Sequence, residues 1–424
     1  MPGSKWGHAP GLDGFLDSLK LRKVDASVEH LVALLRRRQI KGSEACATAT
    51  AHILLQVVAK DKWTDVDDLL TRIQLTGRRL VTAQPRELVI GNIVRRVLGL
   101  IRDEASEERN DNSTTSPPSV ESPAKPLHRP HALASLGSFV RTPSNFNLLS
   151  IAGDITPITA RSNASTPKIG SGTSTPLGPT QSTNVHALRS EVIDGIEEIM
   201  DEIKQVDEQI QSYADTFINP GDYVLVHQPS KTVQKFLTRA SLKRKFTVFV
   251  AVNPSAGTKP EDQYASLRRS LASHGSSVIT IMNAGLMVYM SRVNKVILSG
   301  RAITAQGGVI VEGGAVSIAQ AARERQRDVM ILGGVYKVCP DTSIVPEDLV
   351  EWADPAKHVS YGDGALVSRA TVRYPVSEYL PGDSVNTYIT NLGAHVQDNL
   401  QTIIAEHYKE EDIDFDLYTV PHRH

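Results

Sequence analysis

The residues best suited to chemistry follow short apolar segments in the second half of the chain. The tetrapeptide His227–Ser230 follows the first segment, Ser299–Arg301 follows the fourth, and two glycine pairs come later, Gly307-Gly308 and Gly313-Gly314. Backbone N–H groups of a glycine pair at the start of a helix could hold a phosphate. The chain nevertheless contains neither a P-loop pattern nor a Gly-x-Gly-x-x-Gly sequence after the first segment. Glycines at strand-to-helix turns more often serve positive φ angles and tight packing, and that interpretation is favoured here.

Acid–base chemistry has few candidates at these positions. No Asp or Glu directly follows any of the five clearest apolar segments, whereas a catalytic sheet domain normally places a general acid or base there. His227 is the only histidine at such a position, and a single histidine is more often a hydrogen-bonded structural residue. Cys339 precedes Pro340 without an activating neighbour in the sequence, so a small apolar packing role is expected. We expect no metal site and no cofactor.

The elements that must position these residues alternate along the chain. Continuous apolar segments predict strands that are buried on both faces, and the helix-like stretches between them predict a parallel, Rossmann-like sheet of the α/β class. The predicted strands are Tyr223–Val226, Phe246–Val252, Val278–Met282, Val296–Leu298 and Val329–Leu332. The predicted helices are Thr232–Leu242, Pro260–Ser273, Ala284–Met290 and Ala315–Arg325. Towards the end, Val367–Val372 could add a late strand and Val396–His407 a closing helix.

The first part of the chain has a different pattern. Apolar residues recur there at helical spacing and never alternate with a period of two, which predicts an all-α N-terminal domain over residues 1–105. Pro85 interrupts this pattern before Glu87 opens the next helix, and the last helix is expected to end near Ile101 to Glu104.

Residues 106–184 change abruptly in composition. These 79 residues contain 10 of the 23 prolines and 24 Ser or Thr, with few apolar residues, so a disordered insertion is predicted. Six Ser-Pro or Thr-Pro pairs in it could be phosphorylated, but such pairs are also expected from this composition alone.

Residues 185–218 predict an amphipathic connecting helix that leads into a Rossmann-like domain over residues 219–424. Its apolar face is formed by Val192, Ile193, Ile196, Ile199, Ile203, Val206 and Ile210. The opposite face is acidic, and residues 189–208 hold eight acids against Arg189 and Lys204. Such a face is usually only solvated, but Glu191, Asp194 and Glu198 could also form a docking surface for a basic partner.

Overall composition limits the classes of function. The chain has 424 residues, 40% of them hydrophobic, and its formal net charge of −1 argues against direct binding of nucleic acid. No apolar run approaches the ~20 residues that a membrane helix needs. From the first ten residues, which lack an apolar segment, we expect no secretory signal, and two cysteines, Cys46 and Cys339, cannot form a disulfide framework. We expect a soluble protein of the reducing cytosol, with no membrane contact.

Several separate motifs, in the same order, resemble the regulatory subunits of eukaryotic translation initiation factor 2B. Three lie in the second half of the chain, at Val224–Leu237, Lys243–Ala251 and Met290–Ile297. The stretches Gly77–Pro85 and Gly91–Leu98 are most similar to the beta branch of that family, and Asn391–Gly393 fits it as well. The resemblance covers most of the chain except residues 106–184.

The regulatory subunits are in turn similar to methylthioribose-1-phosphate and ribose-1,5-bisphosphate isomerases. This similarity places Gln228 at the position of the isomerase's catalytic Cys and Arg301 at that of its catalytic Asp. Gln cannot act as a thiol acid, and Arg stays protonated and cannot serve as a carboxylate base. The resemblance therefore implies a vestigial pocket without catalysis. Its residues are His227, Gln228, Arg301, Gln306, Gly307 and Glu312.

The resemblance also implies partners. The alpha, beta and delta subunits form a regulatory core, and the epsilon subunit, held with gamma, carries out guanine-nucleotide exchange on initiation factor 2. Phosphorylation of the alpha subunit of initiation factor 2 inhibits that exchange, so the leading hypothesis is a non-catalytic regulatory beta subunit. The alternatives are a sugar-phosphate isomerase with a displaced site and a phospho-regulated scaffold that works through residues 106–184.

Overall fold

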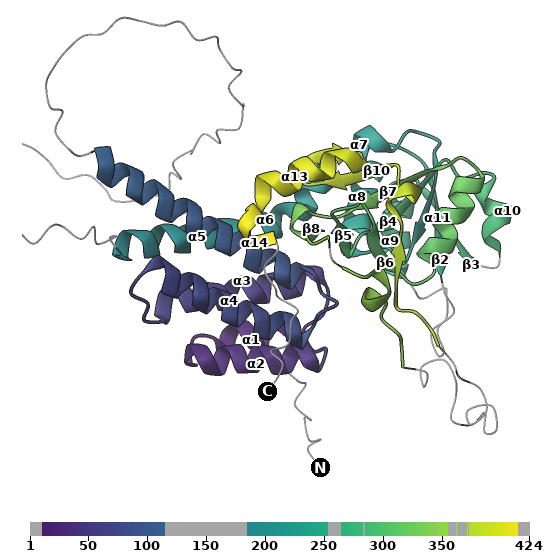
Figure 1. The fold of residues 1–424 in the computed structure, drawn as a ribbon. Coiled ribbons are helices and arrows are strands. Elements are labelled where there is room, and N and C mark those ends of the chain that lie inside the picture. The colour runs from purple at the N-terminus through teal and green to yellow at the C-terminus, as the bar shows by residue number, and fades with distance from the viewer. Residues whose placement is uncertain are drawn as a thin grey trace, which may run out of the picture. The chain divides into compact units, whose positions relative to one another are not determined.

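The computed structural model describes residues 11–114, 185–252, 264–282, 285–342, 344–354, 362, 371 and 373–413 (Figure 1). Contacts place the residues before and after the insertion in one compact unit. The first part is helical, as predicted. Its helices are α1 (Leu12–Ser18), α2 (Val24–Arg36), α3 (Ser43–Lys60), α4 (Val66–Ala83) and α5 (Val89–Thr114).

Helix α5 is longer than the sequence pattern predicts. It continues to Thr114, about ten residues beyond the expected end near Glu104, into the stretch assigned to the insertion. The apolar periodicity stops after Ile101, but the residues up to Arg109 include Arg, Glu and Ala, which favour a helix, and no Gly or Pro up to Thr114 terminates it. The remainder of the predicted disordered insertion, residues 115–184, lies outside the described residues.

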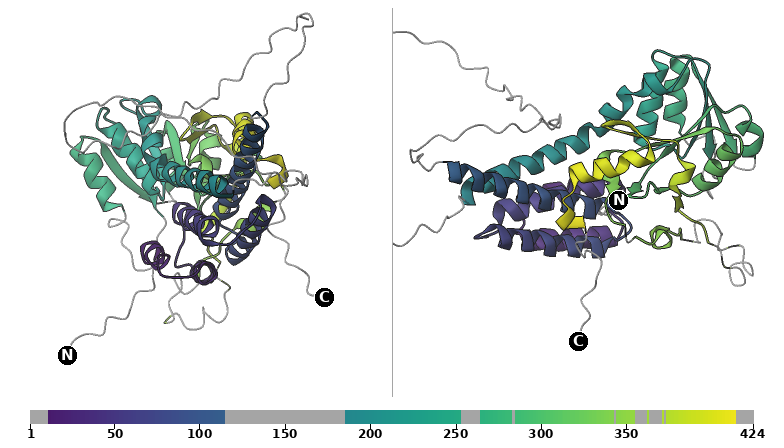
Figure 2. Two further views of the ribbon diagram at one scale, coloured as in Figure 1. Left: turned by 90° about the vertical axis from the view of Figure 1, so that its left-hand side faces the viewer. Right: turned by 45° about the horizontal axis from the view of Figure 1, so that its top comes forward.

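Helix α6 (Val185–Ser212) is shared between the helical part and the sheet. It packs on α3 at one end and on α8 (Lys231–Ser241) and β10 (Thr387–Thr390) at the other, and Figure 2 shows its length well. The predicted apolar face is buried except for Ile193, which is partly exposed. A short helix, α7 (Ala214–Phe217), completes the connection to the first strand.

The main sheet has seven strands in the order β11-β10-β7-β4-β1-β2-β3. The five predicted strands are confirmed as β1 (Tyr223–His227), β2 (Thr247–Val252), β3 (Ser277–Met282), β4 (Lys295–Ser299) and β7 (Asp328–Leu332), all parallel. Two further strands were not predicted. They are β10, parallel to β7, and β11 (Gly393–His395), which is antiparallel to β10 and closes the edge.

Side chains of the sheet alternate between two apolar cores, which gives a three-layer α/β architecture. Val224 and Val226 of β1 pack with α6, α8 and α9 (Ala265–Ser273) on one face, whereas Leu225 packs on the other. That second face is covered by α10 (Leu286–Met290), α11 (Ala315–Glu324) and α13 (Leu400–His407). Burial on both faces explains why β1, β2, β4 and β7 read as continuous apolar runs, whereas β3, predicted to be buried as well, lies at the sheet edge and is largely exposed.

A second, four-stranded sheet has the order β8-β5-β6-β9 and was not predicted. Its strands are β5 (Ala302–Thr304), β6 (Val309–Glu312), β8 (Val338–Cys339) and β9 (Ser377–Leu380). Strands of two to four residues are too short to show a hydrophobic periodicity. The sequence pattern therefore did not reveal them, and only the glycines near them stood out.

The end of the chain only partly follows the prediction. The predicted closing helix forms from Leu400 to His407, with a 3₁₀ turn (Gln397–Asn399) before it and a short helix, α14 (Glu410–Ile413), after it. The predicted strand Val367–Val372 falls outside the described residues except for Thr371. In the part of the chain that the structure describes, no helix is both long and apolar enough to span a membrane.

Candidate functional site

His227 is buried at the carboxyl end of β1, with 1% of its surface exposed. Its Nδ1 lies 3.1 Å from the carbonyl oxygen of Ala251, and its Nε2 lies 2.8 Å from the carbonyl oxygen of Gly313. Burial lowers the pKa of His227, although both carbonyl oxygens favour the protonated ring and partly oppose that shift. His227 therefore ties β1 to β2 and to the start of α11, as expected for a structural histidine.

Gln228 directly follows His227 and is half-buried. Its φ of 40° lies in the left-handed region, which an L residue other than glycine adopts only at a cost. Its side-chain amide lies 3.5 Å from Nε2 of His227. The carboxyl end of β1 is thus a strained turn that carries an amide, without a thiol.

The glycine pair before α11 serves packing and chain direction. The N–H of Gly313 donates to the carbonyl oxygen of Val376 at 2.9 Å, and a Cβ added at Gly313 would lie 2.1 Å from the carbonyl oxygen of Pro375. Gly314 has a φ of 95°. At the first turn of α11, the N–H of Val316 donates to the carboxylate of Glu378 at 3.2 Å. The protein's own carboxylate thus occupies the helix N-terminus that the sequence suggested for a phosphate.

Arg301 lies among three carboxylates that come from both parts of the chain. Its guanidinium is 3.6 Å from Glu87, which precedes α5, and 3.9 Å from both Glu312 and Glu351. Glu351 also accepts two hydrogen bonds of 2.6 Å from Arg38, which follows α2. We call these five residues the interdomain charge cluster. Two arginines compensate most of the charge of three glutamates, and Arg301 links the helical part to the sheet.

Within this cluster, the pKa of Glu312 is clearly shifted. Burial raises the pKa of Glu312, Arg301 opposes that shift, and Glu351 and Glu87 add to it. The ionised carboxyl is thus less favourable in the folded chain than in the unfolded one.

We expect Glu312→Gln to flatten the pH dependence of stability. Between the ordinary pKa of 4.5 and the raised pKa, the folded chain binds Glu312's proton more tightly, so the free energy of unfolding falls as pH rises through that window. Glutamine cannot titrate and removes this fall. Urea unfolding of both proteins at a series of pH values above 4.5 checks this, and parallel profiles would contradict it.

Gln306 and Gly307 do not lie with the other predicted pocket residues. In the β5–β6 hairpin, Ala302 pairs with Ile310 and Ile303 with Val309, so residues 305–308 form the turn, and Arg301 and Glu312 lie at the open end. At the turn, the hydroxyl of Tyr388 donates to Gly307 and the side chain of Gln397 donates to Gln306. Of the six predicted pocket residues, the structure brings His227, Gln228, Arg301 and Glu312 towards one edge and leaves two apart.

The predicted docking residues Glu191, Asp194 and Glu198 are all exposed on α6. Glu202, on the same helix, instead turns towards α5 and accepts a hydrogen bond of 2.6 Å from Arg96. The acidic face is therefore narrower than the sequence suggested, but its three named residues remain available to a partner.

The remaining predicted groups are buried. Cys339 has Nη1 of Arg95 at 4.0 Å, yet burial raises the pKa of its thiol to about 11, which leaves it protonated at neutral pH. Among the described residues, no group of three His, Cys, Asp or Glu could hold a metal ion.

The interdomain charge cluster was not predicted from the sequence. Arg38, Glu87 and Glu351 lie far apart in the sequence, so no local pattern connects them with Arg301.

These features define a class of protein in which one long helix joins a helical N-terminal part to a Rossmann-like α/β part. In this chain, Gln228 follows β1 and Arg301 follows β4. The chain belongs to the initiation factor 2 subunit family, whose sequence model matches residues 39–396.

Individual relatives agree with this assignment. The chain is 31% identical over 407 residues to translation initiation factor eIF2B subunit beta of Schizosaccharomyces pombe, covering 94% of this chain and 99% of that one. The crystal structure of eIF2B beta from Chaetomium thermophilum is 40% identical, with a TM-score of 0.65, covering 95% of this chain and 97% of that chain. The structure of the tetrameric eIF2B-beta2-delta2 complex of C. thermophilum matches at 40% identity and a TM-score of 0.64, with 94% and 100% covered.

The predicted relation to isomerases is also found. Ribose 1,5-bisphosphate isomerase of Pyrococcus furiosus is 26% identical over 215 residues, or 50% of this chain and 65% of that one. The resemblance to initiation factor 2B regulatory subunits is thus confirmed, and the fold is that of an eIF2B beta-like protein.

Proposed function

We propose that this chain is the non-catalytic, regulatory beta subunit of the cytosolic exchange factor initiation factor 2B. It would assemble with alpha, delta, gamma and epsilon subunits, bind initiation factor 2, and take part in sensing phosphorylation of the alpha subunit of that factor. The beta-subunit relatives support the subunit assignment because they match along nearly the whole chain. The relative solved as a beta2-delta2 tetramer supports a heteromeric role.

The observation that carries the non-catalytic part of this proposal is the position of Arg301. A catalytic carboxylate at this position would face Glu87, Glu312 and Glu351, three like charges, instead of compensating them. Gln228 adds to the argument because an amide cannot exchange a proton as a thiol does. An ion-paired link between two parts of the chain explains Arg301 better than catalysis does.

An exposed apolar patch offers a surface for subunit assembly. Strand β3 forms the edge of the main sheet, and its Ile279, on the same face as α10, is 41% exposed, whereas Met282, on the opposite face, is 47% exposed. The neighbouring α10 exposes Met287 and Val288, the latter by 75%. Apolar side chains beside a strand edge that no other described strand pairs with are typical of a surface that another subunit covers.

The acidic face of α6 is our candidate for contact with a basic surface on initiation factor 2. Reversing Glu191, Asp194 and Glu198 to Lys should weaken that binding by about tenfold at low salt, with a steep salt dependence, because exposed charges act mainly through screened attraction. Binding of purified initiation factor 2 to the assembled complex measures the effect.

The matched control reverses three exposed acids elsewhere in the helical part, Asp13, Asp17 and Asp25. If both triple variants weaken binding equally, only the net charge matters. If neither does so at low salt, the acidic face of α6 is merely solvated.

The proposed function is tested by purifying the tagged chain from its native cytosol at moderate salt. Recovery in a complex with four further exchange-factor subunits supports the proposal, and recovery alone or as a homo-oligomer overturns it. Deleting residues 115–182 distinguishes the scaffold alternative from the regulatory subunit. The scaffold alternative expects this deletion to abolish function, whereas the regulatory-subunit proposal expects the core assembly to survive.

The alternative function is a sugar-phosphate isomerase, which the curated isomerases matching half of the chain favour. Purified full-length chain incubated with ribose 1,5-bisphosphate tests it directly. Turnover that disappears in Gln228→Ala would support the isomerase, and an inactive chain that assembles with its partners would support the regulatory subunit.

A further inference from the structure

A basic region covers α8, α9 and the strands that follow them. The described residues from 231 to 252 and from 264 to 282 contain eight Lys or Arg and no Asp or Glu. Four of these cations recur at intervals of four residues, which places Lys231, Lys235 and Arg239 on one side of α8 and Lys243 just beyond its end. We call Lys231, Lys235, Arg239 and Lys243 the basic stripe; all four are exposed.

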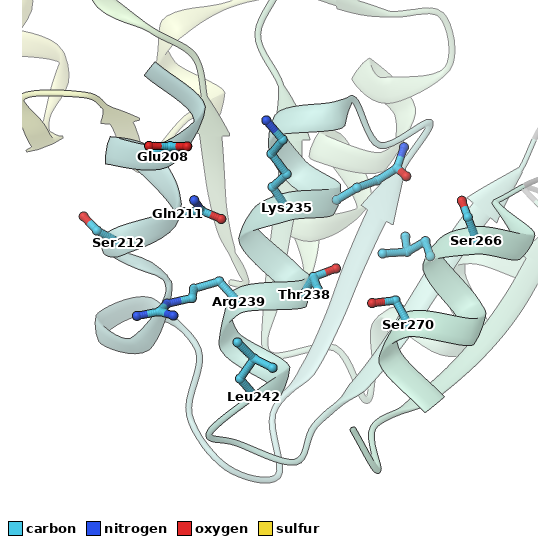
Figure 3. Close-up of a pocket in the computed structure, with 11 residues that line it drawn as sticks. Glu208, Gln211, Ser212, Lys235, Thr238, Arg239, Leu242, Ser266 and Ser270 are labelled. Atoms are coloured by element: carbon cyan, nitrogen blue, oxygen red, sulfur yellow. The ribbon is translucent and has the colours of Figure 1, made fainter. Parts of the chain in front are cut away.

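The stripe lies beside a groove of about 610 Å³. Helix α8 forms its centre, the end of α6 one side and α9 the other, as Figure 3 shows. Thr238 of α8 points across the groove towards Ser270 of α9. The lining is polar apart from two leucines, Leu242, which is 55% exposed, and Leu267, which is buried. The groove thus combines cations, hydroxyl groups and a small apolar surface.

The acids that face this region come from α6 and α7, and they neutralise only part of it. Asp207 lies 2.9 Å from Lys235, Asp215 lies 2.6 Å from Lys243, and Glu208 lines the groove. Within the described part of the chain, no ion pair or hydrogen bond engages the side chain of Lys231 or Arg239. Lys231, at the start of α8, therefore has no such partner, whereas Arg239 makes no direct contact but lies close enough to Asp215 to help lower the pKa of that carboxyl.

We propose that this groove binds an acidic protein segment that also carries an apolar side chain. Carboxylates of the segment would pair with Lys231 and Arg239, and its apolar side chain would cover Leu242. Charge complementarity selects the occupant, because a row of cations that is only partly neutralised attracts carboxylates and repels basic partners. The site is distinct from the acidic face of α6, so the chain would offer two docking surfaces of opposite charge.

A protein segment fits this groove better than a nucleic acid does. Single-stranded nucleic acids are bound by aromatic side chains on which their bases stack. The residues that line the groove include no aromatic side chain, so they offer the bases no stacking surface. Glu208 and Asp207 would also repel a continuous phosphate chain more than a segment with spaced carboxylates.

The test uses the purified full-length chain and a synthetic, fluorescein-labelled helical peptide with Glu at i and i+4 around a Leu. We expect anisotropy to show saturable binding at low salt that Lys231→Glu with Arg239→Glu weakens by about tenfold. The control reverses two exposed arginines on the opposite face of the sheet, Arg323→Glu with Arg325→Glu, and should leave binding unchanged. Circular dichroism confirms that both variants are folded.

Three results would overturn the proposal. One is the absence of peptide binding at low salt, and another is an equal loss in the control variant. The third is a different occupant, shown either by oligouridylate binding more tightly than the peptide or by self-association of the chain that the stripe variant abolishes. A peptide with Gln in place of Glu should bind weakly, and equal binding would show that charge does not select the occupant.

Discussion

Replacing Arg301 by Met should lower the free energy of unfolding by about 3 kcal/mol at neutral pH, because it leaves a largely buried group of carboxylates without its central cation. Arg301 is 20% exposed and Glu87 is 6% exposed, so solvent screens this interaction only partly. The backbone contacts of Arg301, from its N–H to Ile310 and from Ser43 to its carbonyl, do not depend on the side chain and should persist. The loss thus reports on the charge. Urea unfolding followed by tryptophan fluorescence measures it.

Two further variants separate charge from packing in this experiment. Arg301→Lys keeps the cation and should recover most of the stability, whereas Arg301→Met combined with Glu312→Gln should recover part of it by removing one unpaired carboxylate. The cost of Arg301→Met should also shrink as the pH falls, because the orphaned carboxyl groups take up protons. An unchanged free energy of unfolding in Arg301→Met would show that the interdomain charge cluster contributes nothing and would free Arg301 for another role.

The strands with long apolar segments could be predicted from the sequence. The strands whose position depends on pairing with residues far away in the sequence could not. Strands β1, β2, β3, β4 and β7 were recognisable because both of their faces are apolar. Strand β10 is also internal to the sheet, but Thr387–Thr390 offers only two apolar residues. Its place beside β7 follows from a long crossover through the second sheet, which no local pattern encodes. The four short strands of the second sheet escaped for the same reason.

The candidate site shows a similar division. The position of His227 at a strand end followed from the apolar run before it, and its structural role matches what a single histidine there usually does. The cluster around Arg301 could not be read from the sequence, since Glu87 and Glu351 reach it only after the helical part packs on the sheet. The basic stripe was not predicted, although Lys or Arg at every fourth position from 231 to 243 is a pattern that the sequence alone shows.

Replacing Gly313 by Ala should also destabilise the chain strongly, by about 3 kcal/mol, because the added Cβ meets backbone that cannot yield without moving a strand. That Cβ would lie 2.1 Å from the carbonyl oxygen of Pro375, just ahead of β9. Any shift of Gly313 also disturbs its carbonyl oxygen, which lies 2.8 Å from Nε2 of His227. The variant thus strains the β6–β9 pairing and the end of β1 together.

The matched control is Gly333→Ala at the end of β7, where the nearest atom to an added Cβ would be at 3.6 Å, an ordinary contact. Its cost should stay below about 1 kcal/mol. Unfolding in the presence and absence of inorganic phosphate then separates packing from phosphate binding. If Gly313 is required for packing, both variants and the parent respond equally to phosphate, because Glu378 already occupies the start of α11. Stabilisation of the parent by phosphate that disappears in Gly313→Ala, with stability otherwise unchanged, would instead show that the glycine pair still cradles an anion.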